Sequence, residues 1–214
     1  MTLAIVPAAG SSRRMGRPKL LLPWAATTVL GAVVAALRGA GVEAPLLVLG
    51  PASDGAAVAG AAEAEPLHAW AAAANLRIAE NPHPERGMLS SILAGLDALG
   101  GGEELARRGE VLLVCPADLP ALRASTVRAL LAAMQTAGAP LALPRHRGRH
   151  GHPLAIAPHL IPAIAHLDPA IGLRQLRDRH AAELLALDVD DPGCVADVDT
   201  PADYAGLSVN AGPG

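Results

Sequence analysis

Four cationic side chains lie within seven residues of the loop PAAGSSRRMGRPK, which spans positions 7–19. They are Arg13, Arg14, Arg17 and Lys19. A triphosphate carries roughly as much negative charge, and Arg and Lys bind it through charge-assisted hydrogen bonds. Small residues around Gly10 would also let backbone N–H groups approach an anion closely. The residue types therefore indicate an anion site, although a solvated turn with incidental arginines also explains them.

The spacing within this loop excludes the two commonest phosphate-binding motifs. A Walker A loop needs Gly, four residues and then Gly-Lys-Ser/Thr. Here five residues separate Gly10 from Gly16, and Lys19 follows three positions later. The dinucleotide-binding pattern GxGxxG is not matched either. The kind of anion therefore stays open at this point.

Carboxylates follow in two later segments. Asp118 lies in PADLP (116–120), directly after an apolar run, where it could hold Mg²⁺ or form an Asx-turn that ends a strand. Asp197 and Asp199 open DVDTPADY (197–204), and their spacing puts both on one face of an extended segment. They could complete a metal site with Asp118. Asp199 or Thr200 could instead cap a helix that begins at Pro201.

Two further segments carry polar residues in loops. In NPHPERGMLSSILAGL (81–96), Gly87 permits close approach of the backbone to a base or ribose, and Ser91 lies near a helix N-terminus. An ordinary loop with a capping serine is the alternative. In RHRGRHGHP (145–153), three histidines (146, 150 and 152) could suggest a transition-metal site, but the intervening glycines disfavour it. A cationic loop that holds an acceptor phosphate or pterin is favoured over a solvated loop.

Apolar runs at 3–7, 46–50, 76–79 and 111–115 predict buried strands, and 140–143, 153–157 and 184–188 are candidate strands. A first helix is expected from a cap at Thr27 or Thr28 to Gly39, and a second ends at about Ala73. A third begins at a cap at Ser90, and a fourth runs from a cap at Ser125 or Thr126 to Ala137. Further helices are expected at 159–166, at 173–180 and from Pro201. Residues 100–108 are interpreted as a surface connection. This alternation predicts a three-layer α/β/α fold with a mostly parallel, Rossmann-like sheet. The loops after 3–7, 76–79 and 111–115 should open at one edge, where active sites lie.

The 214 residues suit one domain, over 1–208, with a frayed tail at 209–214. A net charge of −3 gives no reason to expect a nucleic-acid partner. Two cysteines form no disulfide framework, and Cys115 is expected to pack in a strand. The sequence shows no signal peptide and no apolar run of about 18 residues, so a cytoplasmic protein without a membrane partner is expected.

The string AAG-x-S-x-RMG-x-PK-LLLP resembles the signature of the MobA-like nucleotidyltransferases, and among them the molybdenum cofactor cytidylyltransferases most closely. The segments at 81–96, 116–120, 149–156 and 197–204 match the same family in the expected order, over nearly the whole chain. The resemblance implies a nucleotide-diphospho-sugar transferase-like fold. It also implies a Mg²⁺-dependent transfer of CMP from CTP to Mo-molybdopterin, a phosphorylated pterin, with release of pyrophosphate.

The family's residue roles carry over to matching positions of this sequence. Nucleotide binding falls to Pro7, Ala8, Ala9, Gly10, Ser12, Arg14, Lys19, Asn81, Gly87 and Ser91. Arg14, Lys19 and Asp118 would be catalytic, and Asp118 would hold Mg²⁺ with Asp197 or Asp199. The acceptor would bind at His150, Gly151, His152 and Pro153.

Rival functions remain compatible with these motifs. Guanylyl transfer to the same acceptor is one, although the guanylyl-transferring relatives carry Asn-x-Asn where this chain has Asp197 and Asp199. Cytidylyl transfer to methylerythritol phosphate is another, with a poorer match in the later motifs. A non-catalytic nucleotide sensor or a chaperone that delivers cofactor to a molybdoenzyme is a third, but a pure binder would not need the three carboxylates. A molybdoenzyme partner fits either reading.

Overall fold

One mixed sheet forms the centre of the protein in the computed structural model, which describes residues 1–10, 15, 18–52 and 61–208. Its strands follow the order β10-β7-β9-β6-β1-β4-β5, and the short β8 pairs with β7. The strands are β1 (Thr2–Pro7), β4 (Leu46–Leu49), β5 (Arg77–Glu80), β6 (Val111–Val114), β7 (Leu141–His146), β8 (Arg149–His150), β9 (Leu154–Ile156) and β10 (Leu184–Asp188). A separate two-stranded ribbon pairs β2 (Pro23–Trp24) with β3 (Thr27–Thr28).

Most of the strands run in the same direction. Parallel pairs join β1 to β4 and β6, β4 to β5, and β7 to β10, whereas β9 lies antiparallel between β6 and β7. The predicted strands therefore form, and the prediction of a mostly parallel sheet is confirmed. The carboxyl ends of β1 and β6 lie next to each other, which brings the loops that follow them to one edge.

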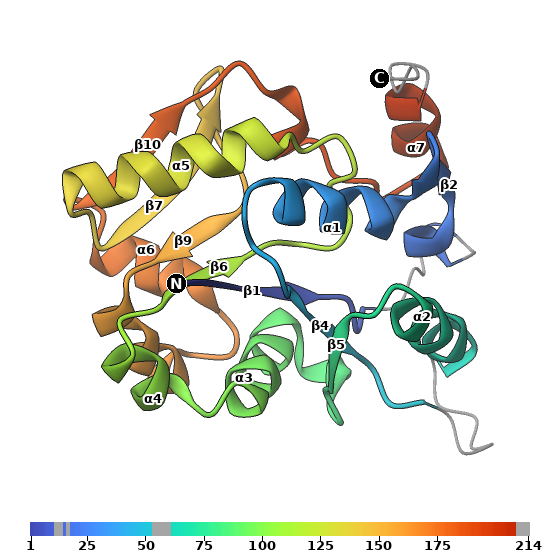
Figure 1. Cartoon of the computed structure of the whole chain (residues 1–214), viewed down its shortest axis with the longest axis horizontal. Coiled ribbons are helices and arrows are strands. Elements are labelled where there is room, and N and C mark those ends of the chain that lie inside the picture. The colour runs from blue at the N-terminus through green and yellow to red at the C-terminus, as the bar shows by residue number, and fades with distance from the viewer. Residues whose placement is uncertain (11–14, 16–17, 53–60, 209–214) are drawn as a thin grey trace.

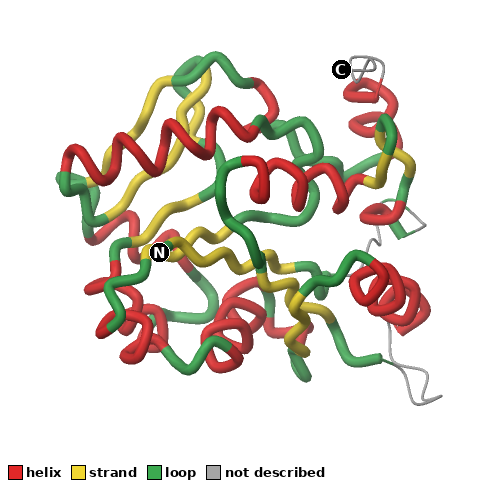
Figure 2. The backbone as a smooth tube through the Cα atoms, viewed as in Figure 1, coloured by secondary structure: helices red, strands yellow, loops and turns green. Residues whose placement is uncertain are grey.

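Helices cover both faces of the sheet, as Figures 1 and 2 show. Along β1, Ala4 and Val6 belong to one apolar cluster and Leu3 and Ile5 to the other, as alternation in a strand requires. The first cluster is built with α1 (Val29–Gly39), α2 (Ala61–Ala73) and α5 (Ala124–Ala137), with α7 (Pro201–Ser208) at its margin. The second is built with α3 (Met88–Ala98), α4 (Gly102–Arg107), α6 (Leu173–Arg179) and the 3₁₀ helix η3 (Pro158–His166). The three-layer α/β/α prediction is confirmed.

Two predicted helix starts were wrong because the capping side chains bond elsewhere. Helix α3 begins at Met88 and has Gly87 as its N-cap, while Ser90 Oγ donates to the carbonyls of Gly87 and His83. Helix α5 begins at Ala124, and the Thr126 hydroxyl donates to the carboxylate of Asp191 at 2.6 Å. The predicted cap at Thr28 is confirmed, since its hydroxyl accepts from the N–H of Gly31 at 3.0 Å.

Residues 100–108, predicted as a surface connection, contain helix α4 instead. Leu105 is fully buried against the second apolar cluster, and this contact fixes the short helix. The predicted tail at 209–214 lies outside the described residues. Within the described ranges, no helix combines the length and apolar character that crossing a bilayer requires.

Candidate active site

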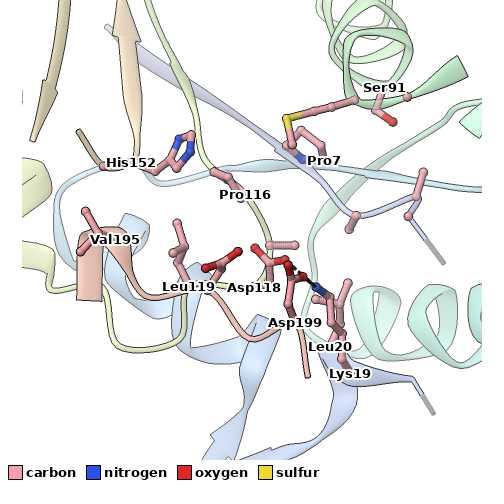
Figure 3. Close-up of a pocket in the computed structure, with 18 of the residues that line it drawn as sticks. Pro7, Lys19, Leu20, Ser91, Pro116, Asp118, Leu119, His152, Val195 and Asp199 are labelled. Carbon is pink, nitrogen blue, oxygen red and sulfur yellow. Dashed lines mark hydrogen bonds and ion pairs between the residues drawn. The ribbon is translucent and has the colours of Figure 1, made fainter. Parts of the chain in front are cut away.

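A cavity of about 550 Å³ opens at the carboxyl ends of β1 and β6, and we call it the main cavity (Figure 3). Its lining comprises residues 7–10, Lys19, Leu20, Pro84, Gly87, Met88, Ser91, residues 116–119, residues 149–152, Val195, Asp197 and Asp199. The loops after β1, β5 and β6 therefore share one edge, as their position after the strands predicted.

The end of β1 forms a floor of small residues. The Ala8 N–H donates to the carbonyl of Val48 at 2.8 Å, so the sheet ladder continues into the loop and fixes its backbone. Beyond it, a Cβ added to Gly10 would meet no heavy atom of the described residues within 4 Å, so they leave the backbone there open. Ser12 and Arg14, predicted to bind nucleotide, lie outside the described residues, as do Arg13 and Arg17.

Lys19 joins two carboxylates from distant parts of the chain. Its Nζ donates to Asp118 Oδ2 at 2.7 Å and to Asp199 Oδ1 at 2.9 Å (Figure 3). All three side chains are at most a quarter exposed. Burial lowers the pKa of Lys19, but its charge interactions and hydrogen bonds with Asp118 and Asp199 outweigh burial and raise the pKa above 10.5. Lys19 is therefore a cation at neutral pH.

A backbone hydrogen bond brings the last carboxylates to Asp118. The N–H of the fully buried Val198 donates to the Asp118 carbonyl at 2.9 Å. Asp197 and Asp199 flank Val198 and both line the main cavity, as their spacing predicted. Thr200 and Asp203 form the reciprocal bonds of a capping box at the start of α7, so Thr200 and not Asp199 caps this helix.

The donor chemistry here fits a hard divalent cation. Two carboxylate oxygens, from Asp118 and Asp199, converge on one positively charged atom, and oxygen ligands are what Mg²⁺ and Mn²⁺ prefer. Among the described residues, however, no three His, Cys, Asp or Glu side chains are gathered closely enough to hold a metal ion. A cation that bound the same two oxygens, Asp118 Oδ2 and Asp199 Oδ1, would take the place of Lys19 Nζ.

Asn81 organises the loop after β5 from inside the protein. Its Nδ2 donates to Ser90 Oγ at 2.8 Å and Ser91 Oγ at 3.0 Å, and its Oδ1 accepts from the His83 N–H at 2.9 Å. Asn81 is buried and is not among the lining residues, so the structure does not bring this predicted nucleotide-binding residue to the cavity. Its bonds instead fix Ser91, which does line it.

Gly87 and Ser91 present backbone and hydroxyl to the same space. Gly87 has φ +86°, a conformation that favours glycine, and a Cβ there would meet no heavy atom within 4 Å. Ser91 Oγ accepts from Asn81, which leaves its O–H to donate. Both residues line the main cavity, and their contact with a base and sugar stays a prediction.

The basic loop forms the opposite wall. The Gly151 N–H donates to the Pro144 carbonyl and the His152 N–H to the Cys194 carbonyl, both at 2.8 Å. His150, Gly151 and His152 line the main cavity, whereas Pro153 is buried and is not among its lining residues. The adjoining His146 is also buried, and its Nδ1–H donates to the Val189 carbonyl at 3.0 Å.

Charges around the main cavity act on His152. His152 is exposed to the cavity, but desolvation by the protein atoms around it lowers its pKa below 6.5. The charges of Asp118 and Asp197 oppose this shift, and the charge of Arg177 adds to it. Cys115 is fully buried, and burial followed by the charge of Asp118 raises the pKa of its thiol to about 12. This agrees with packing and not with a nucleophile.

Several lining residues were not predicted. Arg149, Pro84 and Met88 all face the main cavity. Each belongs to a segment that the sequence had indicated, since Arg149 adjoins the predicted acceptor loop and the other two lie within 81–96. The segments were therefore visible in the sequence, whereas the choice of side chains within them depends on local backbone geometry.

The chain matches the family model described as MobA-like NTP transferase domain over residues 4–184. Among curated proteins, the molybdenum cofactor cytidylyltransferase of Escherichia coli (strain K12) is 28% identical over 204 residues. That alignment covers 94% of this chain and 92% of the relative.

Solved structures agree with this match. Rv0371c from Mycobacterium tuberculosis H37Rv is 29% identical with a TM-score of 0.73, covering 97% of both chains. A second structure of Rv0371c, a complex with manganese, is 27% identical with a TM-score of 0.70, covering 97% of this chain and 98% of that one. A nucleotidyl transferase from Methanothermobacter thermautotroptrophicus shares the fold, with 23% identity, a TM-score of 0.76, and coverage of 99% and 97%.

Proposed function

The chain belongs to the MobA-like NTP transferase domain family, and from this we propose that it transfers CMP from CTP to Mo-molybdopterin with release of pyrophosphate. The observation that carries the proposal is the meeting of Lys19, Asp118 and Asp199 at the carboxyl edge of the sheet. A cation and two carboxylates at one point suit a reaction in which a polyphosphate and a divalent metal must be held together.

The donor nucleotide would occupy the main cavity. The open backbone of residues 8–10 would approach its phosphates, and Gly87 and Ser91 would contact its sugar or base. Lys19 would exchange its carboxylate partners for the β- and γ-phosphates, and Arg14 would assist it. Because these side chains neutralise charge on the leaving pyrophosphate, their effect is greatest in the transition state.

Asp118 and Asp199, with Asp197 beside them, would hold the metal ion. Mg²⁺ supplies charge neutralisation and orients the reacting groups when bound. The manganese complex of Rv0371c supports a divalent metal in a related protein. The acceptor phosphate is already ionised, so no side chain is required as a general base. His150, Gly151 and His152 would face the acceptor from the opposite wall.

The choice of cytosine rests on the family resemblance and on the name of a relative. Asp197 and Asp199 stand where guanylyl-transferring relatives carry Asn-x-Asn, and the curated relative is named a cytidylyltransferase. The experiment incubates the protein with Mo-molybdopterin, Mg²⁺ and each NTP in turn and follows pyrophosphate. We expect CTP to be preferred, and a preference for GTP would overturn the assignment.

Replacing a carboxylate of the site tests whether the protein is an enzyme or a non-catalytic binding protein. Asp118→Asn should lower the rate at least about 100-fold by removing charge stabilisation of the reacting groups. Asp97→Asn, at an exposed position on α3, is the matched control and should leave the rate unchanged. Magnesium-independent nucleotide binding without pyrophosphate release would instead favour the sensor or chaperone. A molybdoenzyme that receives the product is a partner compatible with the proposed reaction.

A further inference from the structure

A second cavity of about 260 Å³ adjoins the main cavity, and we call it the apolar slot. The two share Met88, Pro116, Gly151 and His152 as a common wall. Figure 3 labels His152 and Pro116 among the residues that line the main cavity. A molecule that reacts in the main cavity could therefore extend past His152 into the slot.

The slot is apolar inside and at its mouth. Its inner lining includes Leu89, Ile92, Val114, Leu143 and Leu154. Of the three large hydrophobic side chains that are exposed in the described part of the chain, two belong to the slot: Met88 (54% exposed) and Ile171 (46%). Ligand pockets are mostly apolar with a few placed polar groups, and whole drug-sized ligands take about 300–1,000 Å³. The slot thus suits the ring portion of a ligand whose remainder lies in the main cavity.

One cation of the slot has no counter-ion within the described part of the chain. Arg177 on α6 is half-buried and lines the slot, and among the residues that the structure describes it has no hydrogen-bond or ion-pair partner. Its neighbour Arg174 also lines the slot but pairs with Asp178 at 3.6 Å. Arg177 also acts electrostatically on His152, so its charge is felt at the shared wall. A half-buried guanidinium without a partner is suited to bind an anion, and phosphate matches its geometry.

We propose that the apolar slot holds the planar ring system of the acceptor and that Arg177 binds the acceptor's phosphate at the shared wall, where the acceptor passes His152 into the main cavity. The inference rests on the proposed function, to which it adds the part of the site that selects the acceptor. The apolar walls would favour a flat heterocycle, and Arg177 would require that it carry negative charge. CTP binding would not involve Arg177, because that residue lines only the slot.

Equilibrium binding of fluorescent pterins tests the slot without turnover. The probes are 6-hydroxymethylpterin and its monophosphate, added to wild type, Arg177→Gln, Arg177→Lys and Arg179→Gln. Arg179 lies on the same helix, is exposed and does not line the slot, so it is the matched control. Arg177→Gln should weaken the monophosphate at least about tenfold, since charge-assisted hydrogen bonds are among the stronger ones. Arg177→Lys should restore part of the affinity, and Arg179→Gln should match wild type.

The unphosphorylated pterin tests the ring contacts. Arg177→Gln should barely change its affinity, whereas Ile171→Ser should weaken both pterins to a similar degree. Thermal melts of each variant show whether it is folded. Absence of pterin monophosphate binding to wild type, or equal affinities of wild type and Arg177→Gln, would overturn the inference.

Steady-state kinetics with CTP and Mo-molybdopterin separates this inference from the proposed function. Arg177→Gln should raise the KM for the acceptor at least about tenfold and leave the KM for CTP unchanged. If Arg177→Gln turns over normally with the acceptor KM of wild type, the assignment of the slot is contradicted and the proposed function stands. Suppose instead that pterin binding depends on Arg177 but the wild type releases no pyrophosphate. That result would contradict the proposed function and support the assignment of the slot.

Discussion

Lys19 is the single lysine of a chain that carries sixteen arginines, and it lies where three charges meet. An ammonium is a compact charge with three donors on a flexible stem, so it can exchange one set of oxygen partners for another. Arginine's planar fork is less able to do so. The position therefore suits a cation that holds two carboxylates at rest and phosphates during reaction.

Replacing Lys19 tests this role. Lys19→Ala should lower kcat at least about 100-fold, because a donor that stabilises developing charge is lost. Lys19→Arg keeps the charge but changes its geometry, and we expect a smaller loss. Stopped-time assays of pyrophosphate release measure both, and near-wild-type turnover of Lys19→Ala would remove Lys19 from the mechanism.

His152 should make the stability of the protein depend on pH, and the direction of that dependence can be worked out. Desolvation by the surrounding protein, helped by the charge of Arg177 and opposed by Asp118 and Asp197, holds the pKa of His152 below 6.5 in the folded state. The unfolded chain then takes up a proton first, so this contribution to stability is complete above pH 6.5 and is lost as the pH falls through the folded pKa. Wild type should therefore lose more stability than His152→Gln between pH 7.5 and 5.5.

Urea unfolding at the two pH values measures that difference, and an NMR titration of the His152 ring gives its pKa directly. A midpoint above 6.5 would contradict the expected direction. The matched control is His166→Gln, at an exposed position away from both cavities, which should leave the pH dependence of stability unchanged.

At the scale of single residues, the sequence indicated which positions gather but not how they pair. Asp118 and Asp199 were expected at one edge, and they are there. Their bonds to Lys19 span 99 and 180 positions, and spacing along the chain carries no information about such contacts. Asn81 was expected at the nucleotide, yet its side chain points inward. It is held there by hydrogen bonds to Ser90 and Ser91, and the sequence does not show where these two serines lie on α3.

At the scale of elements, the 3₁₀ helix η4 (Pro192–Val195) controls where the last carboxylates lie. The buried Asp191 carboxylate accepts from the Gly193 N–H, the Arg123 N–H and the Thr126 hydroxyl, so it fastens η4 to the start of α5. Gly193 packs directly on the backbone of residue 121. Residues 197–199 follow η4 within a few positions, so a shift of η4 would move them.

Gly193→Ala tests this linkage. Its Cβ would lie 2.0 Å from the Ala121 carbonyl oxygen, so backbone must move, and we expect a loss of roughly 1–3 kcal/mol or more in unfolding free energy together with lower activity. Gly206→Ala in α7, where a Cβ meets no heavy atom within 4 Å, is the control and should be neutral or slightly stabilising. Chemical denaturation measures both, and unchanged stability of Gly193→Ala would show that η4 is not held this way.

Elements with strong apolar patterns could be predicted, and weakly patterned ones could not. The strands at 3–7 and 111–115 are continuous apolar runs that only a buried strand of a parallel sheet explains well. Helix α4 is six residues long, follows two glycines and begins with a third, so its local sequence resembles a connection. It exists because Leu105 packs in the core, a tertiary effect that local propensity does not contain.

At the scale of the whole molecule, the main cavity draws residues from position 7 to position 199. A ligand that bridges these segments binds the folded state and not the unfolded chain, so it should stabilise the entire fold. At 100 times its dissociation constant, CTP with Mg²⁺ should add about 2.7 kcal/mol. Thermal melts with CTP alone, Mg²⁺ alone and both together measure this.

The combination of nucleotide and metal is the informative condition. We expect the two together to raise Tm by more than the sum of their separate effects in wild type, and to lose that excess in Asp118→Asn. Equal shifts with and without Mg²⁺ would point to nucleotide binding that does not use the carboxylates.

The hydrogen bond from Val198 to Asp118 joins parts of the site that are synthesised at different times. The floor at residues 7–10 and the strand before Asp118 emerge from the ribosome early, whereas Asp199 emerges only after every strand of the sheet. A growing chain can assemble the nucleotide side of the cavity before its second carboxylate exists. If the proposed function holds, the chain can then catalyse the transfer only after the sheet that positions its carboxylates is complete.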